Sequence, residues 1–247
     1  MFEFGSLHDV EALAASYHRS GRVQIREFLA NDSALVIETM LKEQTPWGLC
    51  FNQGDRVAGL RGSDVARLTP EKRSQIMQAV AKGARDGFQF FYQHFPLHSD
   101  YFAASARDVP LFRLFEFINS DAFLDLMRRV TGHGDIAWAD AHATCYQPGH
   151  FLMRHNDEMP NAERRAAYVL NFTREWRPDW GGFLQFFDEN GDVEHGFRPL
   201  FNAVNIFSVP RVHSVEAVSP FAQASRLSVT GWLRADKAPG GIGSRSG

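Results

Sequence analysis

The spacing of apolar residues changes at about residue 136, and this change restricts the folds that the chain can adopt. From there to residue 234, apolar and polar side chains alternate in short runs, which is the pattern of strands with one buried face. Turn residues separate the runs: Pro148-Gly149, Gly181-Gly182, the "ENGD" of 189–192 and Pro220. We therefore expect strands in "IAWADAHATCYQ", "HFLMRHND", "AAYVLNFT", "GGFLQFFD", "NAVNIFSV" and "RLSVTGWLR".

The residues before this change have mainly the period of helices. Apolar residues at helical spacing predict helices over 7–21, 31–44, 69–95 and 118–132. Capping residues support them, since Thr69 suits an N-cap before Pro70, and the last helix lies between Ser120 and Gly132. The other elements expected here are a strand over 23–29 and a hairpin over 47–60.

Helices followed by short strands favour an α+β chain. Such a chain buries its strands in an antiparallel sandwich or jelly roll with helices packed against it. The 247 residues are enough for one large domain. We predict a single domain over 1–236, helix-rich over 1–135 and with a β core over 136–236. The Gly- and Ser-rich end, 237–247, is predicted to be a disordered tail.

Composition excludes several classes of function. The net charge is −3 and no basic block is present, so we expect no nucleic-acid partner. No run of about 18 apolar residues exists, so we expect no membrane span. The N-terminus lacks the apolar segment of a signal peptide, and the two cysteines, Cys50 and Cys145, do not form a disulfide scaffold. These features favour a cytoplasmic protein.

A short motif, "HND", carries the first indication of chemistry. In a strand, residues i and i+2 point to the same face, so His155 and Asp157 are expected to lie together. His213, in a segment typical of an interior strand, is the candidate third ligand. Two histidines and one carboxylate leave coordination positions open and are typical of non-haem Fe(II) oxygenases. The alternative is that these are unrelated polar residues, because HxD is common and the chain has 10 histidines.

An arginine on the last predicted strand supports the metal interpretation. Arg226 begins a row with Ser228, Thr230 and Trp232 on one strand face. A buried guanidinium is costly unless it meets an anion, and its planar fork matches a carboxylate. A 2-oxo acid chelated to iron would bring such a carboxylate. Tyr146 is expected beside the metal strand, across the Pro148-Gly149 turn, although a core tyrosine explains it equally well.

At this point the chain resembles the Fe(II)/2-oxoglutarate-dependent dioxygenases, and in particular their prolyl-hydroxylase branch. That branch includes the HIF-type and ribosomal-protein prolyl hydroxylases. The resemblance extends over residues 136–234 and rests on "HND", on "RRAAYVLNFTREWRPDWGGFLQFF" and on "VPRVHSVEAV" followed by "SRLSVTGWLR". The helix "INSDAFLDLMRRVTG" is similar to the one that precedes the catalytic core in that branch. The implied fold is a double-stranded β-helix with an N-terminal helical layer.

The resemblance also implies roles for individual residues. His155, Asp157 and His213 would bind Fe(II), and Arg226 would bind the far carboxylate of 2-oxoglutarate. The remaining contacts with 2-oxoglutarate would come from Tyr146, Thr230, Leu170 and Trp232. The chain departs from the HIF-type enzymes at Val169, often a tyrosine there, and in a longer loop between His213 and Arg226. Because Asp157 is present, the pattern resembles hydroxylases and not halogenases, in which a small residue replaces it.

The expected function is therefore that of a 2-oxoglutarate-dependent dioxygenase that hydroxylates an unactivated C–H bond. The resemblance implies Fe(II), 2-oxoglutarate and O2, with ascorbate as a further candidate cofactor, and a prolyl residue of a protein or peptide as substrate. Free proline or another small molecule is the alternative substrate. A jelly-roll binding protein with a structural metal and a metal-dependent hydrolase are rival functions, and the hydrolase leaves Arg226 without a role. The sequence leaves the oligomeric state open.

Overall fold

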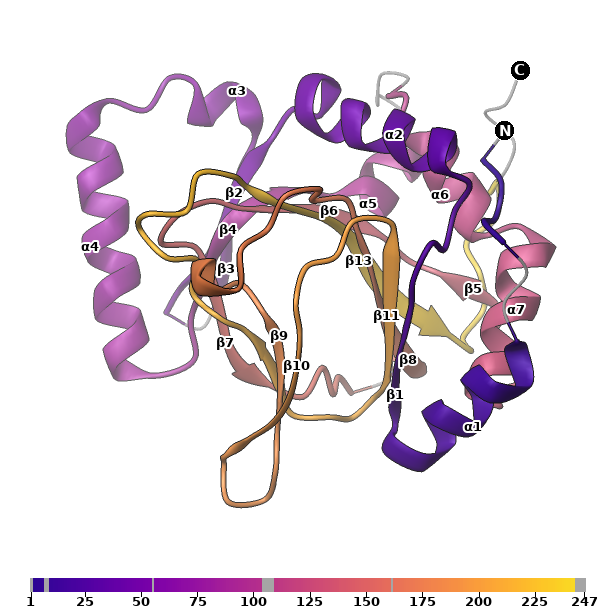
Figure 1. Ribbon diagram of the computed structural model, residues 1–247. Helices are drawn as coiled ribbons and strands as arrows, with labels where there is room; N and C mark the ends of the chain where they lie inside the picture. Colours follow the sequence, from indigo (N-terminus) through magenta and orange to yellow (C-terminus); the bar gives the residue numbers. More distant parts are fainter. Residues whose placement is uncertain (1, 7–8, 55, 104–108, 161, 243–247) are drawn as a thin grey trace.

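Strands from both halves of the chain join in one curled antiparallel sheet. The computed structural model describes residues 2–6, 9–54, 56–103, 109–160 and 162–242 (Figure 1). Within these residues, 10 strands follow the order β1-β11-β8-β13-β6-β4-β7-β12-β9-β10, and β2, β3 and β5 attach to it, giving 13 in all. The sheet curves until β7, β12 and β9 face β8, β13 and β6 (Figure 1). This is the expected double-stranded β-helix, or jelly roll, of an α+β chain.

The predicted strands of the second half are confirmed with changes at their ends, except that "IAWADAHATCYQ" forms two strands, β5 and β6, and not one. The strands run over Arg22–Ile25 (β1), Gly48–Gln53 (β2), Arg56–Leu60 (β3), Phe90–Phe95 (β4), Trp138–Ala139 (β5), His142–Tyr146 (β6), Phe151–His155 (β7), Arg164–Asn171 (β8), Leu184–Phe187 (β9), Val193–Phe197 (β10), Ala203–Ser208 (β11), His213–Val215 (β12) and Arg226–Arg234 (β13). The hairpin of β2 and β3 is also confirmed. Strand β10, which the sequence did not predict, pairs with β9 in a projecting hairpin (Figure 1).

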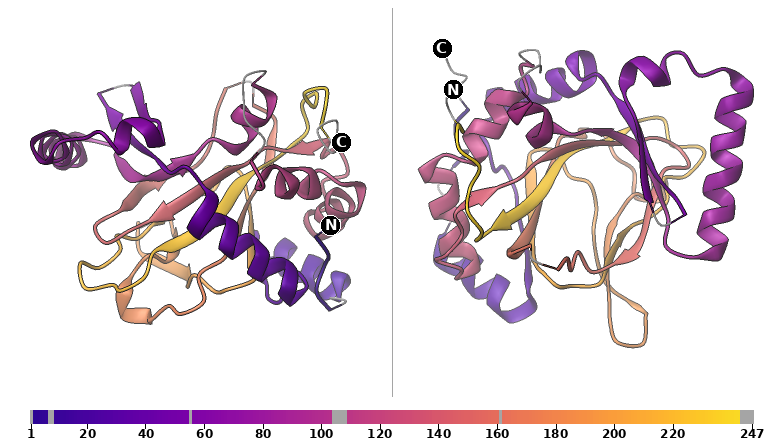
Figure 2. Two further views of the ribbon diagram at one scale, coloured as in Figure 1. Left: turned by 90° about the horizontal axis from the view of Figure 1, so that it is seen from above. Right: turned by 180° about the vertical axis from the view of Figure 1, so that it is seen from behind.

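Helices cover the outer face of the sheet. They run over Val10–Ser20 (α1), Asn31–Thr39 (α2), Gly62–Val65 (α3), Pro70–Asp86 (α4), Leu97–Phe102 (α5), Phe112–Ile118 (α6) and Asp121–Thr131 (α7), with a π-helical turn at Met40–Gln44 and a 3-10 turn at Pro178–Trp180. Helices α1, α6 and α7 lie on one side, and α2 crosses the upper edge in Figure 1. Figure 2 shows α4 at the opposite side, away from the barrel. Of the helices in the described residues, none is both long and apolar enough to cross a membrane.

The main hydrophobic core lies between these helices and the sheet. Phe115 and Phe123 of the helices meet Tyr168 of β8 and Val229 of β13, and none of the four side chains is exposed. Helix α7 begins and ends as expected, because Ser120 Oγ accepts a hydrogen bond from Phe123 N and Gly132 adopts a φ of 77°. The helical layer therefore packs on the strand face opposite to the barrel interior.

The prediction of a single helix over 69–95 is wrong. The helix ends at Asp86, and residues 90–95 form β4. Its side chains alternate, since Phe90 and Tyr92 line the interior while Phe91 packs in a separate outer cluster. The Gln89 side chain fixes the change of direction by exchanging two hydrogen bonds with the Asn52 backbone, at 2.8 and 3.0 Å. The aromatic run "FQFFYQHF" thus follows the strand period, which the preceding helical pattern obscured.

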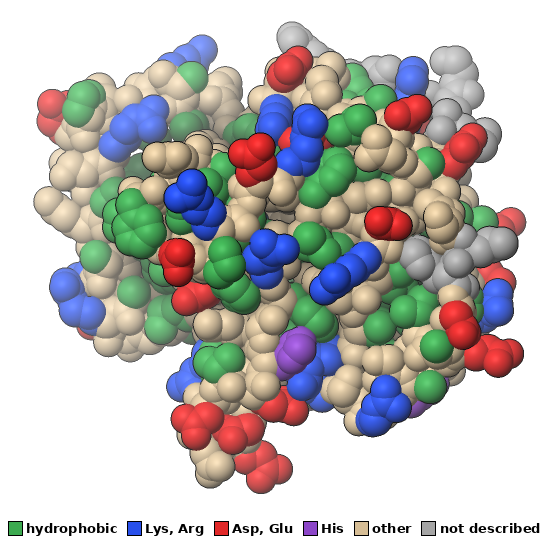
Figure 3. Space-filling view, in the orientation of Figure 1, with side chains coloured by type: hydrophobic (Ala, Val, Ile, Leu, Met, Phe, Trp, Pro, Cys, Tyr) green, Lys and Arg blue, Asp and Glu red, His purple; other side chains and the backbone are tan. Residues whose placement is uncertain are grey.

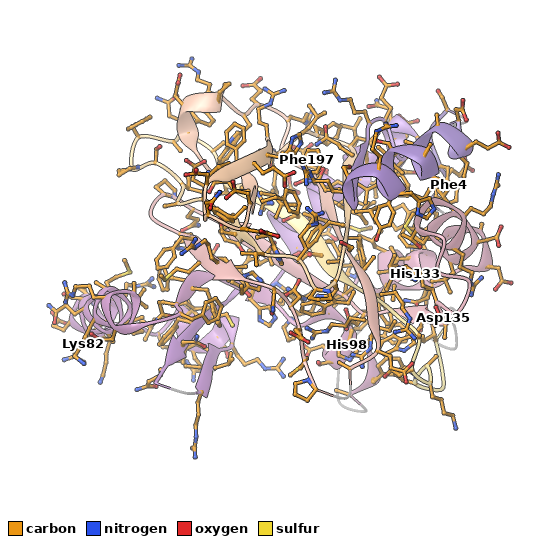
Figure 4. The ribbon with its side chains drawn as sticks, turned by 90° about the horizontal axis from the view of Figure 1, so that it is seen from below. Phe4, Lys82, His98, His133, Asp135 and Phe197 are labelled. Atoms are coloured by element: carbon orange, nitrogen blue, oxygen red, sulfur yellow. The ribbon has the colours of Figure 1, made fainter. Side chains whose placement is uncertain are left out.

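Strand β4 also changes the expected position of Tyr146. The sequence suggested that the strands on either side of Pro148-Gly149 pair as a hairpin. Instead β4 lies between them and pairs with both β6 and β7. Of the predicted tail, residues 243–247 lie outside the described residues. In Figure 4, Phe197 of β10 and His98 of α5 lie on opposite sides of the barrel, and Lys82 of α4 projects away from it.

Candidate metal centre and its cavity

Two strands and the turn after one of them bring the predicted metal ligands together. His155, at the end of β7, pairs directly with His213, at the start of β12. Asp157 Oδ1 lies 3.2 Å from His155 Nε2, and its Oδ2 lies 3.4 Å from His213 Nε2. One ligand atom from each residue lies within 4.8 Å of the others. This separation allows all three to bind a single metal ion.

Asp157 reaches this position by a route that differs from the sequence argument. Strand β7 ends at His155, so strand alternation does not extend to Asp157. Asp157 has a φ of 61°, in the left-handed region that a residue other than glycine rarely adopts. Arg164 stabilises this conformation by donating from Nη1 to the Asp157 carbonyl at 2.8 Å. The Arg164 guanidinium also stacks 3.5 Å from the centre of the Trp232 ring.

The protonation of the two histidines suits a metal. His155 Nδ1 lies 2.9 Å from the Met153 carbonyl, and His213 Nδ1 lies 2.8 Å from the Arg211 carbonyl. Because a carbonyl can only accept, each neutral ring carries its proton on Nδ1 and has its lone pair on Nε2. Burial lowers the pKa of His213 to about 4, which keeps it neutral. Two lone pairs then face a carboxylate, an arrangement that a divalent cation completes.

Asp157 is the charged member of the set. Burial on its own would raise the pKa of its carboxyl group, but the adjacent His155 and His213 lower it to about 2. Asp157 is therefore ionised at neutral pH and supplies one negative charge. Two neutral imidazoles and one carboxylate are the donors that non-haem Fe(II) oxygenases use, so the residues present fit iron.

The three residues open into a cavity of about 200 Å³ inside the barrel. Its lining combines the His155–Asp157–His213 set with two tyrosines, several apolar residues and the inward face of β13. That face carries Arg226, Ser228, Thr230 and Trp232, as the sequence predicted. The cavity thus joins the metal centre to the predicted carboxylate site.

Arg226 is buried without a matching acid. Its side chain is 2% exposed, and among the described residues no carboxylate lies within ion-pair distance of it. Nη1 makes one long contact of 3.5 Å with Ser228 Oγ, Nε has no partner, and the guanidinium lies 5.1 Å from the centre of the Tyr146 ring. Burial lowers the pKa of Arg226, yet an arginine stays protonated in proteins. The cavity therefore contains an unpaired cation that an anionic ligand would stabilise.

The other predicted cosubstrate contacts divide into two groups. Tyr146, Thr230 and Trp232 line the cavity, and Tyr146 lies directly opposite Arg226 on the neighbouring strand. The prediction for Leu170 is wrong, because Leu170 packs in the main core on the other face of β8. Val169, its neighbour, lines the cavity instead. The register explains this, since Val169 pairs with Thr230 while Leu170 pairs with Val229.

Sequence reasoning missed several residues of the cavity wall. Tyr92 stacks on Tyr146 with ring centres 4.9 Å apart, and it went unnoticed because β4 was taken for a helix. His142, to which the sequence analysis assigned no role, lines the cavity. Thr144, whose hydroxyl lies 2.8 Å from Ser228 Oγ, also lines it. Alternation along "HATCY" from Tyr146 would have identified His142 and Thr144.

Buried neutral histidines predict a loss of stability in acid. Burial lowers the pKa of both His150 and His213 from 6.5 to about 4. Between pH 6.5 and about pH 4, these histidines bind more protons in the unfolded chain than in the folded one. Their full contribution to the free energy of unfolding is therefore present above pH 6.5 and is lost as the pH falls towards 4. Between about pH 7 and about pH 5.5, each histidine should remove roughly 1 kcal/mol from the free energy of unfolding.

Urea unfolding of the metal-free protein at several pH values measures this loss. In His150→Gln the free energy of unfolding should fall less over the same pH range, by roughly 1 kcal/mol, because the unfolded chain has one histidine fewer to protonate. An unfolding free energy that is constant over this range would show that these histidines are not buried as neutral rings.

A comparison with protein families matches the strands that carry the metal centre and Arg226. Residues 141–234, which contain all the residues discussed above as metal and carboxylate ligands, match the family model of the 2OG-Fe(II) oxygenase superfamily. A search of curated protein sequences found no match. The match therefore covers the metal ligands and most of the cavity wall, but neither Phe88, Phe90 and Tyr92 of that wall nor the helices before residue 141.

Solved structures resemble the chain over most of its length. A prolyl-4-hydroxylase from Pseudomonas putida is 20% identical, with 92% of this chain and 100% of that chain covered and a TM-score of 0.58. A prolyl hydroxylase from Trichoplax adhaerens, in complex with a hypoxia inducible factor peptide fragment, is 15% identical over 92% and 89%, with a TM-score of 0.58. SnoN, a non-heme alpha ketoglutarate dependent epimerase from nogalamycin biosynthesis, is 12% identical over 94% and 90%, with a TM-score of 0.55. At these identities the likeness establishes the fold.

Proposed function

We propose that this protein, whose residues 141–234 match the family model of the 2OG-Fe(II) oxygenase superfamily, is an Fe(II)- and 2-oxoglutarate-dependent dioxygenase that hydroxylates a prolyl residue in a protein or peptide. The observation that carries the proposal is the pairing, in one cavity, of a three-residue metal centre with an unpaired buried arginine. The fold shared with prolyl hydroxylases supports the choice of a prolyl substrate.

Each residue of the cavity has a role in this proposal. His155, Asp157 and His213 hold the iron, and Arg226 binds the far carboxylate of 2-oxoglutarate with help from Tyr146. When bound, iron and 2-oxoglutarate supply the activation of O2 that hydroxylation of a C–H bond requires. Burial raises the pKa of the Tyr146 hydroxyl, so it stays protonated and can donate a hydrogen bond to that carboxylate. The apolar residues of the lining keep bulk water away from the metal.

Other functions fit the observations less well. Free proline or another small molecule is the nearest alternative, and the epimerase among the structural neighbours shows that the fold serves other reactions. A metal-dependent hydrolase or a binding protein with a structural metal leaves Arg226 buried and unpaired. We place the protein in the cytoplasm, which suits its two free, buried cysteines, Cys50 and Cys145.

Mass spectrometry of the host proteome tests the substrate class. Cells that express the parent protein should contain at least one protein with a +16 Da modification on proline that is absent from cells lacking it. Cells that express Asp157→Ala are the matched control, because only a metal ligand differs, and they should also lack the modification. A modification that persists with Asp157→Ala, or hydroxylation found only on small molecules, would contradict the proposal.

A further inference from the structure

The side chain of His142 lies in the cavity, but it has no role in the proposed function and no hydrogen-bond partner among the described residues. His142 of β6 lines the cavity, with its ring centre 5.8 Å from that of Trp232 and 5.5 Å from that of His94. Among the described residues, neither His142 nor His94 makes a hydrogen bond through its ring. Both residues are partly exposed, and His142 lines the cavity.

The register places His142 away from the carboxylate site. Tyr146 pairs with Arg226, whereas His142 pairs with Thr230, four residues farther along β13. At about 3.3 Å per residue, the two levels are roughly 13 Å apart along the sheet. A 2-oxoglutarate molecule that extends from Arg226 to the metal centre occupies the Arg226 end. His142 therefore lies at the end where a second molecule would approach the metal.

The hydroxyl groups from the middle of the cavity to the His142 end already make hydrogen bonds. Thr144 and Ser228 hydrogen-bond to each other at 2.8 Å, and Thr230 donates to the Tyr168 carbonyl at 2.8 Å. Arg164, the cation beside Trp232, is held by the Asp157 carbonyl and the Trp232 ring. Among the described residues at this end of the cavity, the His142 ring and Trp232 Nε1 are thus the polar groups without a hydrogen-bond partner, and of these only the imidazole can both donate and accept.

The charge state of His142 and His94 limits the chemical groups that they can bind. Burial lowers the pKa of His142 to about 3 and that of His94 to about 4, so both rings are neutral near pH 7. A neutral imidazole offers one donor and one acceptor, which matches the N–H and C=O groups of an amide. It offers a carboxylate no opposite charge. The part of the adjacent Trp232 ring that lines the cavity and is not covered by Arg164 supplies an apolar surface for a saturated ring.

We propose that His142 positions the substrate by hydrogen-bonding an uncharged backbone amide next to the reacting carbon, and that His94 holds the His142 ring in place. The inference rests on the proposed function and narrows it, because it selects a prolyl residue within a peptide and rejects free proline. Phe88, which lines the same cavity and is 46% exposed, marks where the rest of the peptide would leave the site.

A comparison of capped peptides with free proline tests this specificity. The probes are a library of N-acetylated, C-amidated heptapeptides with a central proline, and free L-proline. The parent protein should hydroxylate members of the library and leave free L-proline unmodified. His142→Phe should lower kcat/KM for the peptides about tenfold, the equivalent of one lost hydrogen bond. His142→Gln, which restores a donor and an acceptor, should recover part of the loss.

Two further readouts separate positioning from a general loss of structure. The affinity of His142→Phe for 2-oxoglutarate, measured by calorimetry with Mn(II) in place of Fe(II), should equal that of the parent. Its ratio of succinate formed to peptide hydroxylated should rise, because a poorly placed substrate uncouples the two reactions. His150→Phe is the matched control, since it also removes a neutral imidazole, but one whose Nδ1 faces the Cys145 carbonyl outside the cavity.

Three outcomes would overturn the inference. One is a His142→Phe protein that hydroxylates the peptides as well as the parent does. Another is a parent that hydroxylates free L-proline and no capped peptide, and the third is a parent that forms succinate but modifies no peptide. The absence of any 2-oxoglutarate-dependent succinate from the parent would instead contradict the proposed function.

Discussion

Asp157→Ala should abolish Fe(II) binding and 2-oxoglutarate turnover while the fold is retained. The change removes the single negative charge of the metal centre and leaves two neutral histidines, too few donors for a stable site. His155→Ala and His213→Ala should have the same effect, because each leaves two of the three ligands. Stability should fall only modestly, since the main hydrophobic core lies on the other face of the strands.

Anaerobic Fe(II) titration, together with circular dichroism to monitor folding, measures this result. Asp192→Ala is a suitable control. This exposed acid lies in the turn between β9 and β10, where acidic side chains gather at the tip of the projecting hairpin (Figure 3). The control should bind Fe(II) as the parent does. Full turnover by Asp157→Ala would show that the metal centre is assigned to the wrong residues.

Arg226→Ala should weaken 2-oxoglutarate binding about a hundredfold or more and leave iron binding intact. Removing one partner of a buried charge pair costs roughly 3–5 kcal/mol, and each 1.4 kcal/mol is about tenfold in affinity. Arg226 meets the conditions for such a loss, because it is 2% exposed and no acid among the described residues pairs with it. The metal ligands lie on other strands and are unchanged.

Two further substitutions resolve the geometry of this contact. Arg226→Lys should recover only part of the affinity, because an ammonium group cannot reproduce the planar fork. Tyr146→Phe should cost on the order of 1 kcal/mol, the value of one net hydrogen bond. Calorimetry with Mn(II) measures all three variants, and Arg154→Ala, an exposed arginine on β7, is the control. If Arg226→Ala binds 2-oxoglutarate as tightly as the parent, the arginine is structural.

The alternation of apolar and polar residues predicted most of the strands, because this alternation can be recognised within a short segment of sequence. Alternation in "RLSVTGWLR" placed Arg226, Thr230 and Trp232 on one face, and the structure has them lining one cavity. The same rule would have excluded Leu170, whose neighbour Val169 faces the cavity. The assignment of Leu170 came from the resemblance and not from the alternation of its own strand.

What the sequence could not predict depends on contacts between distant segments. Strand β4 follows a helix after three residues and inserts between β6 and β7, and its partners on these two strands are more than 45 residues away. The position of Asp157 depends on a left-handed backbone that Arg164 stabilises, and not on strand alternation. The His142 ring, which has no hydrogen-bond partner among the described residues, is likewise recognised only when β4 and β13 are placed beside it.

The central claim is that one cavity binds iron and 2-oxoglutarate together. Addition of Fe(II) and 2-oxoglutarate to the protein without oxygen should produce a metal-to-ligand charge-transfer absorption band, because the 2-oxo acid would bind to an iron held by His155, Asp157 and His213. The band should be absent from Asp157→Ala and should need a much higher concentration of 2-oxoglutarate in Arg226→Ala. A parent protein that binds Fe(II) but gives no band at saturating 2-oxoglutarate would contradict the account.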